Sequence, residues 1–304
     1  MNWFEHGGKR GRGVNSLAGR RVFLTGAAGG IGRATAERAA AEGAVLLLTD
    51  LDADGLDATV RAVRAAGGSV AYSRAVDVSS YEEVRTMADA IHADGGAVDV
   101  VMNVAGISAW GTVETLQHRH WRAMVEVDLM GPIHVIESFL PAMVAARRGG
   151  HLVNVSSAAG LIGLPWHAPY SAAKFGLRGV SEVLRFDLRR HRIGVTLVCP
   201  GAVDTPLTET VEIVGVDRES PAMKRLSSAF RARAARPEEV AEKILDGVRH
   251  GRYLVHTSQG VRLLHGLQRL APPLYVLAMR IANRAADRFL GAAVSTRPAG
   301  GGIR

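Results

Sequence analysis

Short apolar runs that alternate with longer amphipathic stretches are the feature that most narrows the fold of this 304-residue chain. The stretches between the runs, such as Ile31–Glu42 and Tyr81–His92, carry apolar residues at helical spacing. Strands that are apolar on both faces and alternate with helices are typical of a parallel sheet covered on both sides. The sequence therefore predicts an α/β protein with a Rossmann-like, doubly wound parallel sheet and helices on both faces. The expected strands are Arg21–Thr25, Val45–Thr49, Ser69–Tyr72, Val98–Met102, His151–Val155, Gly194–Val198 and Arg252–Val255.

The two ends of the chain depart from this pattern. Residues 1–18 are rich in glycine and basic side chains, which predicts a flexible tail before a catalytic domain at 19–258. Residues 259–296 predict an amphipathic C-terminal helical extension, split into two helices by Pro272-Pro273. Residues 297–304 are expected to be disordered. One large domain is the expectation at this length.

The segment 204–236 breaks the regular alternation. It mixes Thr, Pro, Glu and Arg with weak helical periodicity. Two interpretations stay open for it, a lid over a site or a plain surface excursion. A further helix is expected from Pro237 to about Val248, with acidic residues in its first turn.

Charge and cysteine usage exclude several classes of function. The net charge is +8, but the basic residues are mixed with acidic ones. The sequence has no basic stripe with interleaved aromatic residues, so nucleic-acid binding is not expected. The single cysteine, Cys199, permits no intrachain disulfide and no cysteine-based metal site, and no metal is expected. Without an apolar secretory signal or a run of about 20 apolar residues, a cytoplasmic location is expected. For the basic, amphipathic extension at 259–296, packing on its own domain or on a sister subunit is expected. Peripheral membrane contact is the alternative.

A glycine-rich turn follows the first expected strand, at Thr25–Gly32, and a helix follows the turn at once. A tight strand-to-helix turn needs residues without a Cβ, and a pyrophosphate must approach its backbone closely. The helix N-terminus supplies free N–H donors and the positive end of the dipole. This context predicts a dinucleotide-binding turn, with Gly32 allowing the helix to lie close to the sheet.

An acidic residue ends the second expected strand. Asp50 is placed to accept hydrogen bonds from the adenosine ribose and to repel a 2′-phosphate, and Leu51 after it brings no positive charge. NAD is therefore the predicted cofactor. NADP stays possible, because Arg33 has the length to reach a 2′-phosphate.

Tyr170 and Lys174 are four residues apart near the start of an expected helix, so they share one helix face. A phenol has an ordinary pKa of about 10, and a neighbouring ammonium lowers that pKa towards the range of a general base. Ser157 follows an expected strand, and its hydroxyl is placed to hold a substrate oxygen while Tyr170 exchanges the proton. A Tyr-x-x-x-Lys pair alone is common, so the prediction depends on the motifs around it.

Taken together, these motifs resemble the short-chain dehydrogenase/reductase family, in its short-form branch with TGxxxGIG and YxxxK motifs. The resemblance covers about Gly19–Val255. Thr25–Gly32 is similar to the family's glycine turn, and Asp77-Val78 to its adenine pocket. Asn103–Gly106 is similar to the NNAG strand end, with Val104 in place of the second Asn, and Pro200–Thr205 to the PG motif beside the nicotinamide.

The resemblance implies catalytic roles for Ser157, Tyr170, Lys174 and Asp128. Tyr170 acts as acid or base, Lys174 lowers its pKa and binds the ribose, and Ser157 polarises the reacting oxygen. The family usually has Asn where Asp128 stands, completing a tetrad that holds a water. We expect this replacement to remove nothing essential and to shift the pH optimum. The residues expected to bind the cofactor are Gly26, Ala28, Gly29, Gly30, Ile31, Gly32, Asp50, Leu51, Asp77, Val78, Asn103, Ala105, Gly106, Tyr170, Lys174, Pro200, Gly201, Val203 and Thr205.

The predicted function is NAD-dependent interconversion of an apolar secondary alcohol and its ketone by hydride transfer. An NADPH-dependent ketone reductase is the first alternative, and a non-catalytic, cofactor-sensing protein of the same fold is the second. The expected substrate pocket consists of Ser157, Trp110, Leu164, Trp166 and His167. Its mostly apolar walls favour a small apolar substrate. The resemblance also implies a homodimer or homotetramer, formed through helices at about Thr115–Ala146 and Ser171–His191.

Overall fold

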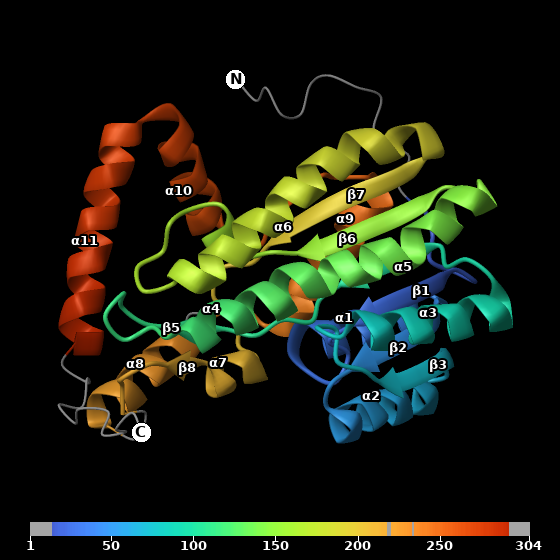
Figure 1. Ribbon diagram of the computed structural model, residues 1–304, viewed down its shortest axis with the longest axis horizontal. Coiled ribbons are helices and arrows are strands. Elements are labelled where there is room, and N and C mark those ends of the chain that lie inside the picture. Colours follow the sequence, from blue (N-terminus) through green and yellow to red (C-terminus); the bar gives the residue numbers. More distant parts are fainter. Residues whose placement is uncertain (1–13, 218–219, 233, 292–304) are drawn as a thin grey trace.

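A seven-stranded parallel sheet forms the centre of the protein (Figure 1). The computed structural model describes residues 14–217, 220–232 and 234–291. The strand order is β3-β2-β1-β4-β6-β7-β9, so the chain reverses direction across the sheet between β1 and β4. Such a reversal opens a crevice at the carboxyl ends of the strands, where α/β proteins bind ligands. The strands are β1 (Arg21–Thr25), β2 (Val45–Asp50), β3 (Ser69–Ala75), β4 (Val100–Asn103), β6 (Gly150–Val155), β7 (Ile193–Cys199) and β9 (Leu254–His256).

Helices cover both faces of the sheet, which confirms the predicted doubly wound fold. Alternate residues of one strand enter different cores: Phe23 of β1 packs with Met87 and Phe139, whereas its neighbour Leu24 packs with Ile244 on the other face. This alternation is why the strands are apolar throughout. One face is covered by α1 (Gly30–Ala41), α2 (Ala53–Ala65) and α9 (Pro237–His250), and the other by α3 (Tyr81–Gly95), α5 (Gly131–Ala146) and α6 (Ala168–Asp187).

The helix expected at about Thr115–Ala146 is three consecutive elements. Helix α4 (His118–Val125) leads into the π-helical turn η1 (Glu126–Met130), which continues as α5. By length and composition alone, this helical segment is apolar enough to cross a membrane, but 44% of its most apolar stretch is buried and α5 lies in the core. It therefore has the character of a core helix.

The N-terminal boundary differs from the prediction. Residues 1–13 lie outside the described part, but Val14 and Leu17 are buried in the core beside β1 and β2. The backbone of Gly19 also donates a hydrogen bond to Gly43. The predicted tail of 1–18 is therefore too long, because two apolar side chains within it pack against the sheet.

The segment after β7 contains α7 (Pro206–Thr210), β8 (Glu212–Ile213) and α8 (Pro221–Arg231). Strand β8 pairs with the short β5 (Ala109–Trp110) in a separate two-stranded sheet. Arg119 of α4 binds both carboxylate oxygens of Glu212, at 2.7 and 3.2 Å, and fixes this sheet to the domain. These contacts hold the segment against α4 and β5.

The C-terminal extension is a pair of helices, α10 (Gln259–Leu270) and α11 (Pro272–Gly291), that stand together at one end of the molecule (Figure 1). Ser258 caps α10 by accepting a hydrogen bond from Val261 N. The break falls at Ala271, directly before the two prolines, as predicted. Residues 292–304, including the predicted disordered tail at 297–304, lie outside the described residues.

Candidate active site

The glycine turn between β1 and α1 is fixed by the end of β4. Thr25 Oγ1 accepts hydrogen bonds from the N–H groups of Val104 and Ala105, each at 3.1 Å. Gly26 has a φ of +74°, and a Cβ there would lie 2.7 Å from Ala105 N, so only glycine fits. A Cβ on Gly32 would overlap the Gly26 carbonyl oxygen. Glycine at position 32 therefore lets the start of α1 approach the Gly26 backbone within the turn, whereas the sequence predicts that it permits close contact between the helix and the sheet.

The N-terminus of α1 carries no side-chain cap, and Thr205 and Pro206 of the loop after β7 lie close to it. Its N-cap residue, Gly29, provides no side-chain hydrogen bond, and the first turn of the helix contains no acidic residue. An uncapped helix N-terminus leaves backbone N–H donors for a phosphate. With Gly30 and Ile31 next in the helix, the turn fits the pyrophosphate of a dinucleotide.

Asp50 stands at the end of β2 beside this turn. Its carboxylate accepts hydrogen bonds from Ala28 N at 2.8 Å and Asp52 N at 3.0 Å. Asp54 in the first turn of α2 adds another acid nearby in the chain. Arg33, the side chain that favoured NADP, instead binds Glu37 at 2.8 Å along α1. The surroundings of Asp50 are therefore acidic.

The predicted adenine pocket has a fixed backbone. Asp77 accepts hydrogen bonds from the N–H and the hydroxyl of Ser79, at 2.9 and 2.8 Å. The Val78 carbonyl oxygen lies 3.0 Å from His134 Nδ1. Deeper in the sheet, Asn103 donates to Asn154 Oδ1 at 2.9 Å, which links β4 to β6 as expected for the first Asn of the motif.

Tyr170, Lys174 and Ser157 come together at the carboxyl edge of the sheet. The Lys174 ammonium lies 5.6 Å from the centre of the Tyr170 ring and donates to the Val155 carbonyl at 3.3 Å. Ser157 follows β6 and caps the short helix η2 (Ala158–Gly160), where its Oγ accepts from Ala159 N. The i, i+4 spacing on α6 and the end of β6 thus assemble the predicted catalytic group.

Asp128 forms a buried ion pair with Lys174. Its Oδ1 lies 3.2 Å from Lys174 Nζ, and the side chains are 0% and 4% exposed. Asp128 is in the π-helical turn η1, a distortion often found at functional sites. The same oxygen accepts from Ile107 N at 3.1 Å, while Oδ2 has no partner within the described residues. A Cβ on Gly106 would lie 2.6 Å from Oδ1, which explains the glycine at the end of that motif.

The ionisation of the phenol is set by burial and two charges. Burial raises the pKa of Tyr170 above its ordinary value; Lys174 lowers that pKa and Asp128 raises it, so the net direction is upward. As predicted, Lys174 lowers the pKa of Tyr170. The prediction that this pKa lies below its ordinary value is wrong for the protein without ligand. Burial lowers the pKa of Lys174, yet Asp128 and Tyr170 outweigh it and raise that pKa. Burial raises the pKa of Asp128, and Lys174 opposes the rise.

The loop after β7 lies over the glycine turn. The Pro200 carbonyl accepts a hydrogen bond from Ala158 N at 2.7 Å, and Gly201 N donates to Thr257 Oγ1. Val203 forms a bridge with Ala235, and a Cβ on Gly30 would lie 3.0 Å from the Thr205 side chain. The predicted PG motif is therefore brought next to the predicted phosphate turn.

Comparisons with known proteins identify the family. The model of the family described as short chain dehydrogenase matches residues 20–213. The putative oxidoreductase SadH of Mycobacterium tuberculosis is 36% identical over 287 residues, covering 93% of this chain and 98% of that protein. A short-chain dehydrogenase/reductase from Burkholderia phymatum, solved in complex with NAD, superposes with a TM-score of 0.76 at 29% identity. The superposed region covers 85% of this chain and 96% of the Burkholderia phymatum chain.

The chain belongs to the short-chain dehydrogenase/reductase family. It is an NAD(P)-dependent oxidoreductase with a Rossmann-like fold. A solved relative with NADPH, a single-residue variant of the actinorhodin polyketide ketoreductase, has a TM-score of 0.71 at 29% identity over 80% of this chain and 97% of its own. Solved relatives thus carry either nicotinamide cofactor.

A row of aromatic rings leads away from the Tyr170 phenol of this dehydrogenase/reductase. The ring centres of His167 and Tyr170 are 6.3 Å apart, and those of Trp110 and His167 are 4.4 Å apart. Burial lowers the pKa of His167, and the hydrogen bond that its Nδ1 donates to the Pro165 carbonyl opposes this shift. Trp110 and Trp166 also pack with Val211, Ile213 and Met223 of the segment after β7.

Helix α11 fixes the loop that carries Trp166 and His167. No residue of α11 was predicted from the sequence to have this role. Trp166 Nε1 donates to Asp287 Oδ1 at 2.9 Å, and Gly163 N donates to the Tyr275 hydroxyl at 3.0 Å. Leu164 packs with Tyr275 on the core beneath α10 and α11. Trp166 has a φ of +65°, which is rare for a bulky residue. No local pattern in the sequence marks a contact across 121 positions.

Proposed function

We propose that this protein interconverts an apolar secondary alcohol and its ketone, with NAD as the hydride carrier. The observation that supports this proposal is the assembly of Tyr170, Lys174 and Ser157 in a chain whose glycine turn leads into an uncapped helix. The bound nicotinamide supplies the hydride chemistry, and the protein supplies alignment and electrostatics. Asp77, Val78, Asn103, Ala105 and Leu51 are the further candidates to line the cofactor site, with the residues of the PG motif.

The proposed proton path runs through the phenol. Tyr170 takes the hydroxyl proton when an alcohol is oxidised and returns it when a ketone is reduced. The Ser157 hydroxyl holds the reacting oxygen, and the Lys174 ammonium favours the phenolate. Asp128 holds Lys174 in place at 3.2 Å and also offsets part of its charge. Because Asp128 raises the pKa of Tyr170, this arrangement favours oxidation at alkaline pH.

NAD is favoured by the acidic surroundings of the expected ribose site. A 2′-phosphate there would meet Asp50 and have Asp52 and Asp54 close by in the chain, and like charges at short range repel. Reduction of a ketone with NADPH is the second candidate, supported by Arg33, which is partly exposed and has to leave Glu37 to reach a phosphate.

The proposed substrate is small and apolar. Trp110, Trp166 and His167 supply aromatic walls, and Leu164 supports the loop from below. We further propose a homodimer or homotetramer, because the outer face of α6 exposes Phe175, Val183 and Phe186. A cytoplasmic location remains our prediction.

Separate fluorescence titrations with NADH and NADPH test the cofactor assignment. We expect tighter binding of NADH, and a loss of that preference in Asp50→Ala, whereas the matched variant Asp57→Ala on α2 keeps it. Tighter binding of NADPH would make the reductase the better proposal. If neither nucleotide binds, a non-catalytic role that needs no cofactor replaces both.

A second experiment tests the chemistry. Tyr170→Phe should abolish turnover of apolar alcohols with NAD while leaving NADH affinity unchanged, because only the hydroxyl is removed. Turnover within tenfold of the wild type in this variant would refute the role of the phenol.

A further inference from the structure

The outer face of α11 carries an exposed apolar stripe. Leu274, Leu277 and Ile281 are 57%, 55% and 58% exposed, and their i, i+3, i+7 spacing places them on one side of the helix. Single exposed apolar residues need no explanation, but an aligned row of three on one helix indicates an interaction surface. Leu270 at the bend before α11 is 88% exposed.

The opposite face of α11 is already occupied. Tyr275 and Asp287 bind the loop at Gly163 and Trp166. Ala286 packs against the buried cluster that contains Met223. These contacts fix the rotation of the helix about its axis. The apolar stripe therefore cannot turn inward without breaking them.

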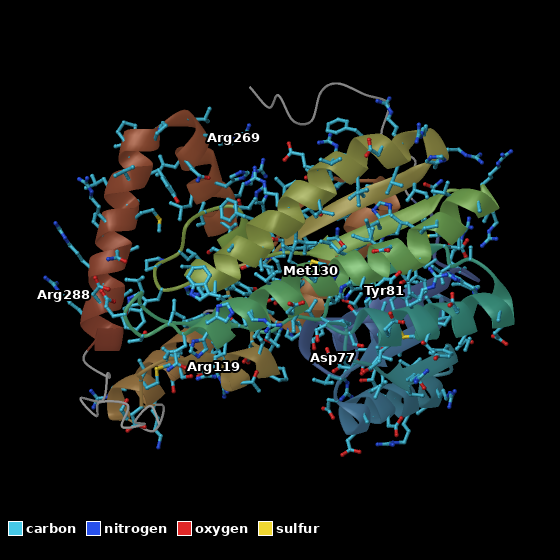
Figure 2. All side chains as sticks on the ribbon, viewed as in Figure 1. Asp77, Tyr81, Arg119, Met130, Arg269 and Arg288 are labelled. Atoms are coloured by element: carbon cyan, nitrogen blue, oxygen red, sulfur yellow. The ribbon has the colours of Figure 1, made fainter. Side chains whose placement is uncertain are left out.

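The stripe continues into basic residues. Arg284 and Arg288 follow Ile281 at the same i+3, i+7 spacing, and Arg280 lies beside them. Within the described part of the chain, these three arginines make no hydrogen bond or ion pair. Figure 2 shows Arg288 on the side of α11 that faces away from the sheet. Helices α10 and α11 contain five arginines and one aspartate, and that aspartate is bound to Trp166.

Charge decides between the two partners that an apolar stripe fits. In a helix pair with a second copy, Arg284 and Arg288 would lie in the seam, against the same arginines or against leucine. Both arrangements bury cations without a partner, which is unfavourable. At an anionic bilayer, the leucines enter the acyl boundary and the arginines reach lipid phosphates.

We propose that the outer face of α11, formed by Leu274, Leu277, Ile281, Arg284 and Arg288, binds the surface of an anionic phospholipid bilayer. The protein then associates peripherally, with α11 lying between the lipid and the loop that carries Trp166. This binding is independent of the oxidoreductase activity.

Flotation of the full-length protein with lipid vesicles tests the proposal. The vesicles are pure phosphatidylcholine, or phosphatidylcholine with phosphatidylglycerol, at low and at roughly 0.5 M salt. We expect at least roughly tenfold stronger partitioning onto the anionic vesicles, weakened by salt. Each arginine near an anionic surface contributes roughly fivefold, so Arg284→Gln/Arg288→Gln should lower partitioning about 30-fold. Leu277→Ser/Ile281→Ser should lower it at least about tenfold.

Matched controls separate this face from general charge and hydrophobicity. Arg189→Gln/Arg190→Gln removes the same charge from the exposed short helix η3 (Leu188–His191), and Val113→Ser removes another exposed apolar residue. Both should partition like the wild type, and NADH affinity reports that every variant is folded. Equal losses in the controls, or no vesicle binding by the wild type, would overturn the proposal. It would also be overturned if Leu277→Ser/Ile281→Ser abolished self-association instead, because the stripe would then bind a second copy.

Discussion

The bond between Trp166 and Asp287 is expected to control substrate binding, which Asp287→Ala tests. A non-glycine residue at positive φ costs about 1–3 kcal/mol, so Trp166 needs compensating contacts at its φ of +65°. The contacts are the 2.9 Å bond to Asp287 and the 2.8 Å bond from Gly111 N to the Trp166 carbonyl. A hydrogen bond to a charged acceptor contributes about 1.5–3 kcal/mol, and because Asp287 is exposed, solvent screening reduces this one to about 1 kcal/mol.

Losing about 1 kcal/mol from a loop held against strain lowers the equilibrium constant for its binding-competent conformation roughly fivefold. We therefore expect kcat/KM for an apolar ketone to fall by up to about fivefold in Asp287→Ala, mainly through KM. Steady-state kinetics with saturating NADH measures this change. The Kd for NADH should not change, because the glycine turn lies on separate elements.

Two further variants make the test specific. Asp287→Asn keeps an acceptor oxygen for Trp166 and should retain most of kcat/KM. Asn283→Ala removes the other side chain that binds Asp287, at 2.9 Å, without touching the loop, and should resemble the wild type. The reasoning is refuted if Asp287→Ala leaves KM unchanged, or if it weakens NADH binding to the same extent.

Three other predictions follow from the site and the core. Asp128→Asn should move the acidic limb of the kcat/KM profile for alcohol oxidation to lower pH, because the charge that raises the pKa of Tyr170 is gone; an unshifted limb would mean that Asp128 carries a proton in the working enzyme. Burial lowers the pKa of His151 to about 4, so the folded state binds its proton less readily than the unfolded state does. The protein is therefore most stable above pH 6.5 with respect to this group, and it loses stability as pH falls from 6.5 towards 4. Urea unfolding should show a loss of roughly 3 kcal/mol across this window, and a same-sized loss in His151→Leu would contradict the assignment. Gly32→Ala should abolish NADH binding in the fluorescence titration, because its Cβ overlaps the Gly26 carbonyl oxygen; retained affinity would show that the turn relaxes.

The sequence by itself determined the fold class and the parts of the site that are local in the chain. The strands are apolar on both faces because both faces are covered, and that pattern can be recognised without a structure. The constraint on Gly32 is local as well, since its Cβ would meet the Gly26 carbonyl oxygen within the turn. The constraint on Gly26 is not local, because its Cβ would meet Ala105 after β4. The spacing of Tyr170 and Lys174 follows from one turn of α6.

Element boundaries were less accessible from the pattern alone. The glycines and basic residues around Val14 and Leu17 predict a tail, yet both side chains are buried against the sheet. The π-helical turn around Asp128 was also not predicted, because its five residues suit an ordinary helix equally well. In both cases, packing against distant elements overrides the local preference.

Only the tertiary structure decided the electrostatics of the site and the role of the C-terminal helices. The pKa of Tyr170 depends on burial first and on Lys174 and Asp128 afterwards, and burial is a property of the whole fold. The bond from Trp166 to Asp287 joins residues 121 positions apart, and the exposed stripe on α11 is defined by which face the loop already occupies. Periodicity shows that a helix has two faces, but the contacts that remove one face from water come from segments elsewhere in the chain.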